Sequence, residues 1–331
     1  MGRRPNTGKS RKFKGKYSGG KKGGGKSGGG QQRKGRNHGH KQKLVFDNAN
    51  FNAYYKAQDI VPEGEWDAFK TTLKTQLPIT FRINEVSAQR DQTRDALRTT
   101  FHFEGTVKVK GRTVSEGDFE CGAPKVVPWY PREMCWQIDC PRALLRKNAL
   151  LKPLHKWLVH ANEAGNVTRQ ELVSMIPPLL LDVQPHHLVF DMCAAPGSKT
   201  TQMVEMLHAG DTVAGRSTGM IVANDADSSR AYMLVHQCKR LASEALIVTT
   251  HQAQVFPKLE KKFDRILADV PCSGDGTLRK NPLVWKTWTV KNGAALFPLQ
   301  VRTFFGYSLF MTGLSCYFRL MIICFSFSFR G

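Results

Sequence analysis

A cysteine that follows a carboxylate at the end of an apolar run is the feature of this 331-residue sequence best suited to chemistry. Cys272 lies in the segment Asp269–Thr277, which reads Asp-Val-Pro-Cys-Ser-Gly-Asp-Gly-Thr. An ionised thiol can add to an electrophilic carbon, and a nearby acid or base can assist the elimination that releases it. The thiolate needs a positive or polar environment, which Lys199 could provide. The alternative interpretation is an unreactive, buried cysteine at a strand end.

A second segment, Asp191–Thr200, carries the residues expected to bind a ligand. The apolar run Leu188–Phe190 before it predicts a strand, and Thr200–Leu207 after it predicts a helix with Met203 on its apolar face. This order is typical of the first βα unit of a nucleotide-binding α/β sheet, in which backbone N–H groups at the helix start hold the ligand. Small side chains in the turn permit close approach. The candidate ligand-binding residues of this turn are Cys193, Ala194, Ala195, Pro196, Gly197, Ser198 and Lys199.

Three further apolar segments, Met220–Ala223, Leu246–Thr249 and Phe263–Asp269, predict strands that alternate with helices. Asp225 follows the first of these segments, at the position where such folds hold ribose hydroxyls. Ligands and chemistry belong at the carboxyl edge of an open parallel sheet. The segment that contains Cys272 is therefore expected at the same edge as Asp225.

Two helix predictions rest on local signals. The helix at residues 229–241 is expected to bury Tyr232. Thr168 is the expected N-cap of a helix that runs to Met175, and Pro177 and the proline after it are expected to end that helix.

Residues 44–165 predict a small α+β domain. The alternating segment Pro78–Ile83 predicts a strand within it. Arg82 on this strand has two interpretations, a contact to nucleic-acid phosphate or base, and an ordinary strand-edge cation.

The first 43 residues hold fifteen Lys or Arg, thirteen Gly and no acidic residue. Such a segment cannot bury enough apolar area to fold, so residues 1–43 are predicted to be a disordered basic arm. The arm suits phosphate-backbone binding, and it also suits a nuclear or nucleolar address. A solubilising tail is the alternative.

The eight cysteines show no Cys-x-x-Cys pair and no His/Cys cluster with zinc spacing, so no metal site is expected. The N-terminus lacks an apolar segment of the kind found in secretory signals. The thiols are therefore predicted to be free, in a reducing compartment.

The segment Asp191–Thr200 resembles the S-adenosylmethionine loop of the RsmB-like (Sun/Fmu) RNA cytosine-5 methyltransferases. The resemblance covers roughly residues 45–300, and its N-terminal part is similar to the RNA-binding region of the eukaryotic tRNA members. The other segments that carry it are residues 60–66, 77–83, 129–131, 174–178 and 271–274.

The resemblance implies an S-adenosyl-L-methionine cofactor and an RNA substrate, with tRNA favoured. It implies that Asp269 and Lys199 contact the cofactor and tune the site, and that Cys272 assists resolution of a covalent adduct. Gln252 stands where the family has an aspartate on the adenine side of the cofactor. An amide can still accept a hydrogen bond there, but it carries no charge.

The family's nucleophile is a second cysteine, in a Thr-Cys-Ser segment after the next strand, and this sequence has no such segment. From about residue 301 the chain departs from the family and becomes rich in Phe, with no acidic residue. We interpret this tail as translated intron. A membrane anchor is too short, since its apolar run falls below the ~20 residues required. Replacement of the nucleophile by Cys316 or Cys324 is disfavoured, because neither has the Thr-Cys-Ser context or a preceding strand–turn pattern.

The predicted fold is therefore α/β: a Rossmann-like methyltransferase sheet (residues 166–300), incomplete after four strands, with a small N-terminal α+β domain (44–165), a basic arm (1–43) and an atypical tail (301–331). The predicted activity is S-adenosylmethionine-dependent methylation of cytosine C5 in RNA. The alternatives are a non-catalytic RNA-binding fragment and a DNA cytosine methyltransferase, although the latter would require Pro-Cys-Gln in place of Pro-Cys-Ser. Neither a membrane nor a metal is expected as a partner, and the sequence leaves the oligomeric state open.

Overall fold

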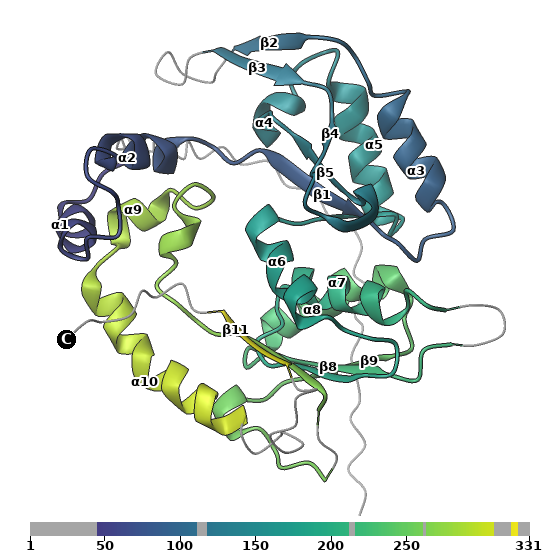
Figure 1. Cartoon of the computed structure of the whole chain (residues 1–331), viewed down its shortest axis with the longest axis vertical. Coiled ribbons are helices and arrows are strands. Elements are labelled where there is room, and N and C mark those ends of the chain that lie inside the picture. The colour runs from purple at the N-terminus through teal and green to yellow at the C-terminus, as the bar shows by residue number, and fades with distance from the viewer. Residues whose placement is uncertain (1–44, 111–117, 212–215, 261–262, 308–318, 324–331) are drawn as a thin grey trace, which may run out of the picture. The chain divides into compact units, whose positions relative to one another are not determined.

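The computed structural model describes residues 45–110, 118–211, 216–260, 263–307 and 319–323 (Figure 1). The predicted basic arm, residues 1–43, lies outside these ranges.

A parallel sheet of five strands forms the C-terminal half of the described chain, in the order β11-β10-β7-β8-β9. The first strand in sequence, β7, lies in the middle, and the order reverses between β7 and β10, which is where doubly wound sheets bind ligands. This arrangement confirms the predicted Rossmann-like fold. The strands are β7 (Leu188–Asp191), β8 (Met220–Asn224), β9 (Leu246–Thr249), β10 (Arg265–Asp269) and β11 (Arg319–Ile323).

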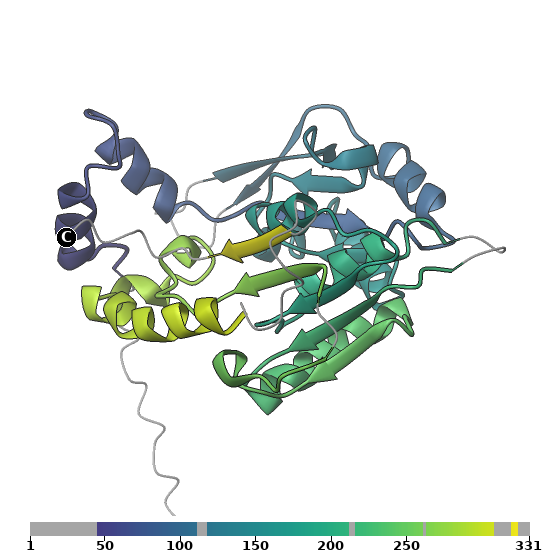
Figure 2. The same cartoon turned by 60° about the horizontal axis from the view of Figure 1, so that its bottom comes forward.

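The prediction that the sheet ends after four strands is wrong. Strand β11 pairs in parallel with β10, from Arg265 opposite Arg319 to Asp269 opposite Ile323 (Figures 1 and 2). An edge strand presents a row of unpaired N–H and C=O groups, and the backbone of β11 satisfies those of β10. Helix α10 (Val290–Tyr307) runs through residue 301 without a break.

Side chains that alternate along the strands pack into two cores on the two faces of the sheet. Val189 and Leu267 belong to the core that contains residues of α6 (Leu172–Leu181), α7 (Ser198–Leu207) and α8 (Ser228–Cys238). Phe190 and Ile266 belong to the core on the opposite face. Residues buried on both faces are expected of a parallel sheet covered on both sides. Met203 is fully buried, as predicted. Tyr232, by contrast, is 78% exposed, because α8 turns Ala231 and Leu234 inward instead.

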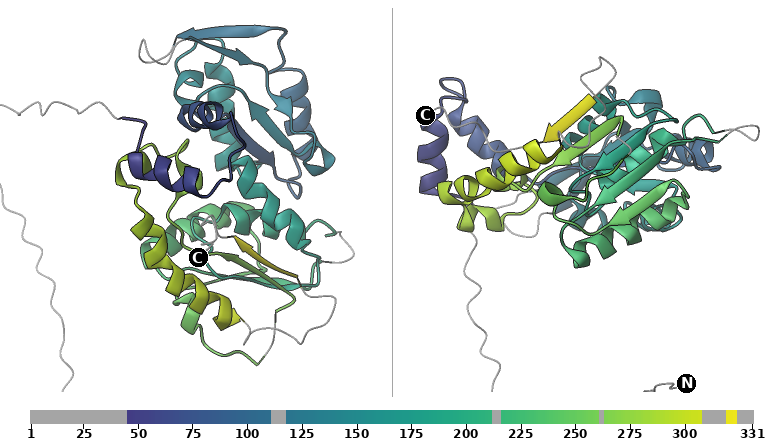
Figure 3. Two further views of the ribbon diagram at one scale, coloured as in Figure 1. Left: turned by 60° about the vertical axis from the view of Figure 1, so that its left-hand side comes forward. Right: turned by 90° about the horizontal axis from the view of Figure 1, so that it is seen from below.

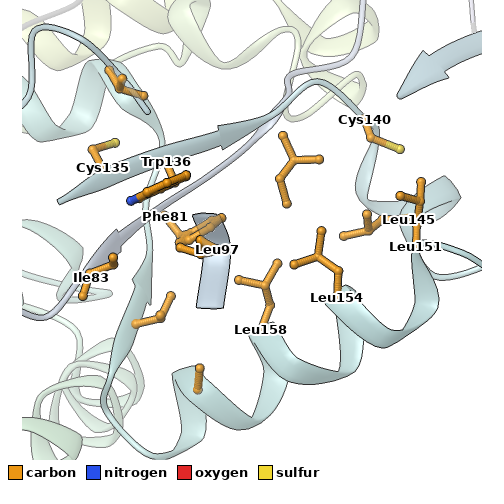
Figure 4. Packing of buried hydrophobic residues seen from close by; sticks show 14 of the residues in the cluster. Phe81, Ile83, Leu97, Cys135, Trp136, Cys140, Leu145, Leu151, Leu154 and Leu158 are labelled. Atoms are coloured by element: carbon orange, nitrogen blue, oxygen red, sulfur yellow. The ribbon is translucent and has the colours of Figure 1, made fainter. Parts of the chain in front are cut away.

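An antiparallel sheet in the order β4-β5-β1-β6 organises the N-terminal part. Its core contains Phe81, Ile83 and Trp136 from the strands and Leu154 and Leu158 from the adjacent helix (Figure 4). The elements of this part are β1 (Ile79–Ile83), α3 (Arg90–Arg98), β2 (Thr106–Lys110), β3 (Asp118–Gly122), β4 (Lys125–Val126), β5 (Cys135–Ile138), α4 (Arg142–Leu145), α5 (Lys152–Glu163) and β6 (Val167–Arg169). The predicted strand at Pro78–Ile83 is therefore confirmed.

The helix predicted to begin at Thr168 begins at Leu172 instead. Thr168 lies in β6, where it pairs with Arg82 of β1, so its backbone is extended. The two prolines lie inside α6 and do not end it. A proline removes the amide that would bond the carbonyl four residues earlier. For Pro178 that carbonyl belongs to Ser174, and it accepts a hydrogen bond from Gln170 Nε2 at 2.9 Å.

The prediction that all thiols are free is wrong for two of them. Cys121 in β3 and Cys140 after β5 form a disulfide whose Cα atoms lie 5.0 Å apart. Both residues are almost fully buried in the N-terminal core. The fold brings the two cysteines together, and their sequence spacing gave no sign of this pairing.

Candidate active site

The turn between β7 and α7 lies at the carboxyl edge of the parallel sheet. Gly197, the residue before the helix, adopts φ = 106°, a conformation that residues with a side chain rarely adopt, so the position favours glycine. Thr200 Oγ1 donates to Asp191 Oδ2 at 2.7 Å, which ties the helix to the end of β7. The N-cap residue of α7 is Gly197, so no N-cap side chain accepts from the N–H groups of its first turn. Such a helix start can accept an anion, and the role of this turn in ligand binding stays a prediction.

Asp225 lies at the end of the neighbouring strand β8, with only 3% of its surface exposed. Its Oδ2 accepts from the Ala195 N–H at 3.2 Å, and its Oδ1 accepts from the Asp227 N–H at 3.1 Å. Arg230 Nη2 lies 3.5 Å from Asp225 Oδ2 and also donates to the Ala195 carbonyl at 2.7 Å. The structure thus brings the predicted turn and Asp225 into direct contact.

Lys199 and Asp269 also meet, as an ion pair of 2.6 Å between Nζ and Oδ2. The pair joins α7 to the end of β10. Cys272 lies three residues beyond Asp269 and is reduced and partly exposed. The role of Lys199 beside Cys272 stays a prediction.

The remaining predicted residues behave differently. Cys193 is half-buried, and desolvation together with nearby carboxylates raises the pKa of its thiol to about 12, which keeps it protonated at neutral pH. Gln252 is exposed after β9, and its Oε1 accepts from Gln254 Nε2 at 2.9 Å. Its predicted contact on the adenine side stays a prediction.

One residue of this edge was missed. The fully buried Asn224 donates from Nδ2 to the carbonyls of Met192 (3.0 Å) and His251 (2.8 Å), and its Oδ1 accepts from the His251 N–H at 2.9 Å. Asn224 therefore fixes the ends of β7, β8 and β9 relative to one another. The available signal was its position, a polar amide at a strand end directly before Asp225.

Neither interpretation of Arg82 is correct. Its side chain is 1% exposed on an inner strand, its Nε donates to Gln170 Oε1 at 2.8 Å, and its Nη1 forms an ion pair with Glu205 of α7. Because the guanidinium is buried and paired, it is not available to nucleic acid.

The two cysteines considered as substitutes for the nucleophile, Cys316 and Cys324, lie outside the described residues. Strand β11 ends at Ile323, directly before Cys324 in the sequence, so a strand does precede Cys324, although the Thr-Cys-Ser context is absent there.

Among the described residues, no cluster of His, Cys, Asp or Glu is arranged to hold a metal ion. Over the same ranges, no helix combines the length and the apolar character that a membrane span needs.

The part of the chain that forms this sheet edge matches a known protein family. Residues 178–302 match the family described as 16S rRNA methyltransferase RsmB/F. The chain is 44% identical over 277 residues to the multisite-specific tRNA:(cytosine-C(5))-methyltransferase of Saccharomyces cerevisiae, covering 78% of this chain and 38% of the relative. It is 40% identical over 272 residues to the tRNA (cytosine(34)-C(5))-methyltransferase of Drosophila melanogaster, covering 79% of this chain and 36% of the relative. The chain thus spans about two fifths of the length of these relatives.

Solved structures show the same fold. NSun6 from Pyrococcus horikoshii with SFG has a TM-score of 0.55 at 19% identity, covering 82% of each chain. A methyltransferase homolog protein from Pyrococcus horikoshii has a TM-score of 0.56 at 21% identity, covering 78% of this chain and 69% of that one.

Proposed function

Because the chain belongs to the RsmB/F methyltransferase family, we propose that it acts in S-adenosylmethionine-dependent methylation of cytosine C5 in RNA, with tRNA as the preferred substrate. The observation that carries the proposal is the convergence at one sheet edge of the turn before α7, Asp225 and the Lys199–Asp269 pair. The names of the eukaryotic relatives support tRNA as the substrate.

The residues at this edge fit the cofactor. The amides at the start of α7 suit its carboxylate, and Asp225 retains acceptor capacity for ribose hydroxyls, since each carboxylate oxygen has two lone pairs. The proposed contacts of Gln252 with the adenine and of Asp269 with the cofactor follow the family resemblance. When bound, S-adenosylmethionine supplies an electrophilic methyl group.

The proposed reaction passes through a covalent adduct between a cysteine and the cytosine base. Cytosine C5 is a poor nucleophile, so the family's reaction requires a cysteine thiolate to bond to C6 before C5 takes the methyl group, and the given sequence does not include the Thr-Cys-Ser segment that carries this thiolate in the family. Removal of the C5 proton then expels the thiolate and restores the ring. We assign Cys272 to the release step, as the resemblance implies. The target base has to leave its stack to reach the partly exposed Cys272.

RNA binding is assigned to two parts of the chain. The basic arm, residues 1–43, is proposed to bind phosphates, and residues 44–165 are proposed as an RNA-binding domain beside the methyltransferase domain at 166–300. The arm also supports a nuclear or nucleolar location. Microscopy of a fluorescent fusion with and without residues 1–43 tests that location, and an unchanged distribution would argue against it.

A second candidate function is RNA binding without methyl transfer. The basic arm favours it, because its fifteen Lys or Arg and its lack of acidic residues suit phosphate binding, which needs charge but no catalytic group.

One experiment separates the candidates. The chain is incubated with S-adenosylmethionine labelled in its methyl group, together with tRNA or duplex DNA, and label in each polymer is counted. Label in tRNA supports the proposal, whereas label in DNA indicates the DNA methyltransferase alternative. Salt-dependent tRNA binding without label supports the second candidate.

A further inference from the structure

An N-terminal segment, Asp47–Gln76, contacts the chain directly after the Cys272 motif. We call this segment the clasp. It contains α1 (Ala49–Ala57) and α2 (Trp66–Lys74), which lie beside α9 (Leu283–Thr287) (Figures 1 and 3). The two regions lie more than 200 positions apart in the sequence. Their contact depends on the tertiary structure, and no sequence motif predicts it.

Hydrogen bonds fix the clasp at both of its ends. Asn48 Nδ2 donates to the carbonyls of Trp285 (2.9 Å) and Trp288 (3.1 Å). Arg279 donates from Nε to the Thr75 carbonyl at 3.1 Å and from Nη2 to the Gln76 carbonyl at 3.3 Å. Each bond uses a backbone carbonyl, so the path of the chain is fixed on both sides of the contact.

Aromatic rings fill the space between these ends. Phe51 is 1% exposed, and its ring centroid lies 5.3 Å from those of both Trp285 and Trp288. Tyr55 packs on Phe51 with a centroid distance of 4.3 Å. These rings belong to one buried cluster with Leu278, so packing alone would hold α1 in place.

The hydroxyl of Tyr55 makes a hydrogen bond that the packing of its ring does not require. It donates to Asp275 Oδ2 at 2.6 Å, and Asp275 lies three residues after Cys272. On the other side of Cys272, the Pro271 carbonyl accepts from Gln300 Nε2 of α10 at 2.8 Å. The cysteine is thus bracketed by two side-chain bonds from distant elements. Gly274 lies between Pro271 and Asp275 and has φ = 82°. Because glycine is conformationally free, we expect the two hydrogen bonds to restrict the loop at this residue.

We propose that Tyr55 is a positioning residue for the Cys272 loop, acting through its hydrogen bond to Asp275. The inference rests on the proposed function, because it takes Cys272 as the group that acts on the substrate. Burial and the neighbouring Asp275 raise the pKa of Tyr55 far above its ordinary value, so the hydroxyl stays protonated and remains a donor at physiological pH. Through this hydrogen bond the clasp helps to hold the Cys272 loop in place.

The test measures the loop itself. The full chain and its Tyr55→Phe variant are treated with iodoacetamide, and the alkylation rate of Cys272 is followed by mass spectrometry. The tryptic peptide Ile266–Arg279 contains Cys272 as its single cysteine. Phenylalanine keeps the packed ring and removes the hydroxyl, so we expect the rate to rise on the order of fivefold, as the loss of one hydrogen bond allows.

Tyr54→Phe is the matched control, because Tyr54 packs on Tyr55 and Trp288 with centroid distances of 5.4 and 5.6 Å. It makes the same chemical change one residue away, and we expect Cys272 to keep its wild-type rate. Asp275→Ala should raise the rate as Tyr55→Phe does, and the double variant should rise no further. A Tyr55→Phe rate equal to wild type, or rates of the two single variants that multiply in the double variant, would overturn the proposal.

This readout also separates the inference from the proposed function. If the chain transfers methyl groups, Tyr55→Phe should lower kcat with little change in KM. If the wild-type chain transfers none, the proposed function fails, while the alkylation rates still decide whether Tyr55 positions the loop.

Discussion

The ammonium group of Lys199, in the first turn of α7, lies 2.6 Å from the carboxylate of Asp269 at the end of β10. The pair joins the two motifs that the sequence singles out, across 70 positions of chain. The Lys199 side chain is 14% exposed and that of Asp269 is 33% exposed. The pair is therefore partly shielded from water but still accessible from the surface.

This pair should be energetically coupled. In a double-mutant cycle of Lys199→Met and Asp269→Asn, we expect a coupling free energy of unfolding of about 1 kcal/mol, because partly buried partners escape full screening. Urea denaturation of the four proteins measures it. The pair Arg216–Glu244, whose side chains are 77% and 75% exposed, is the control and should show no resolvable coupling. Equal coupling in both cycles would refute the special status of the Lys199 pair.

Asp225 should contribute to cofactor binding. We expect Asp225→Ala to weaken S-adenosylmethionine binding at least ~10-fold, since it removes a charged acceptor from ribose hydroxyls. Isothermal titration calorimetry measures the Kd. Asp227→Ser is the control, because serine preserves the N-cap of α8 while removing a carboxylate two residues away. Unchanged affinity in Asp225→Ala would exclude the ribose role.

Asp191 should make the stability of the protein depend on pH. Burial raises the pKa of this carboxyl from 3.8 to about 7. The folded state therefore binds the proton more tightly than the unfolded state, and this group destabilises the fold progressively as pH rises from about 4 to about 7. Asp191→Asn keeps an acceptor for Thr200 and carries no charge. The Tm difference, variant minus wild type, should grow between pH 5 and pH 8, and parallel Tm curves would contradict the assignment.

The basic arm should set the salt dependence of RNA binding. Deleting residues 1–43 removes fifteen cationic side chains and no acidic ones, so fewer counterions are released on binding. We expect a flatter plot of log affinity against log salt concentration for tRNA, measured by fluorescence anisotropy. The same slope with and without the arm would remove it from the interface.

The parallel sheet and its ligand edge were predictable because they depend on local patterns. Apolar runs such as Met220–Ala223 end at polar residues, and buried strands of a doubly wound sheet show that pattern wherever they occur. Gly197 was recognisable as a tight turn between strand and helix for the same reason.

Other features depend on partners that the local sequence does not name. Thr168 carries a capping signal, but pairing with Arg82 decides its conformation. Strand β11 depends on the free edge of β10, and its composition argued against a place in the sheet. The contacts of Arg82 with Glu205 and of Tyr55 with Asp275 span 123 and 220 positions, which is beyond the reach of periodicity.

The most direct test of the proposed chemistry follows the hydrogen at cytosine C5. The chain is incubated with S-adenosylmethionine and tRNA that carries tritium at cytosine C5, and tritium released to water is counted. The account predicts release that requires S-adenosylmethionine and is matched by 5-methylcytidine in the digested tRNA. Methyl transfer with the tritium retained, or tRNA binding with no release at all, would contradict it.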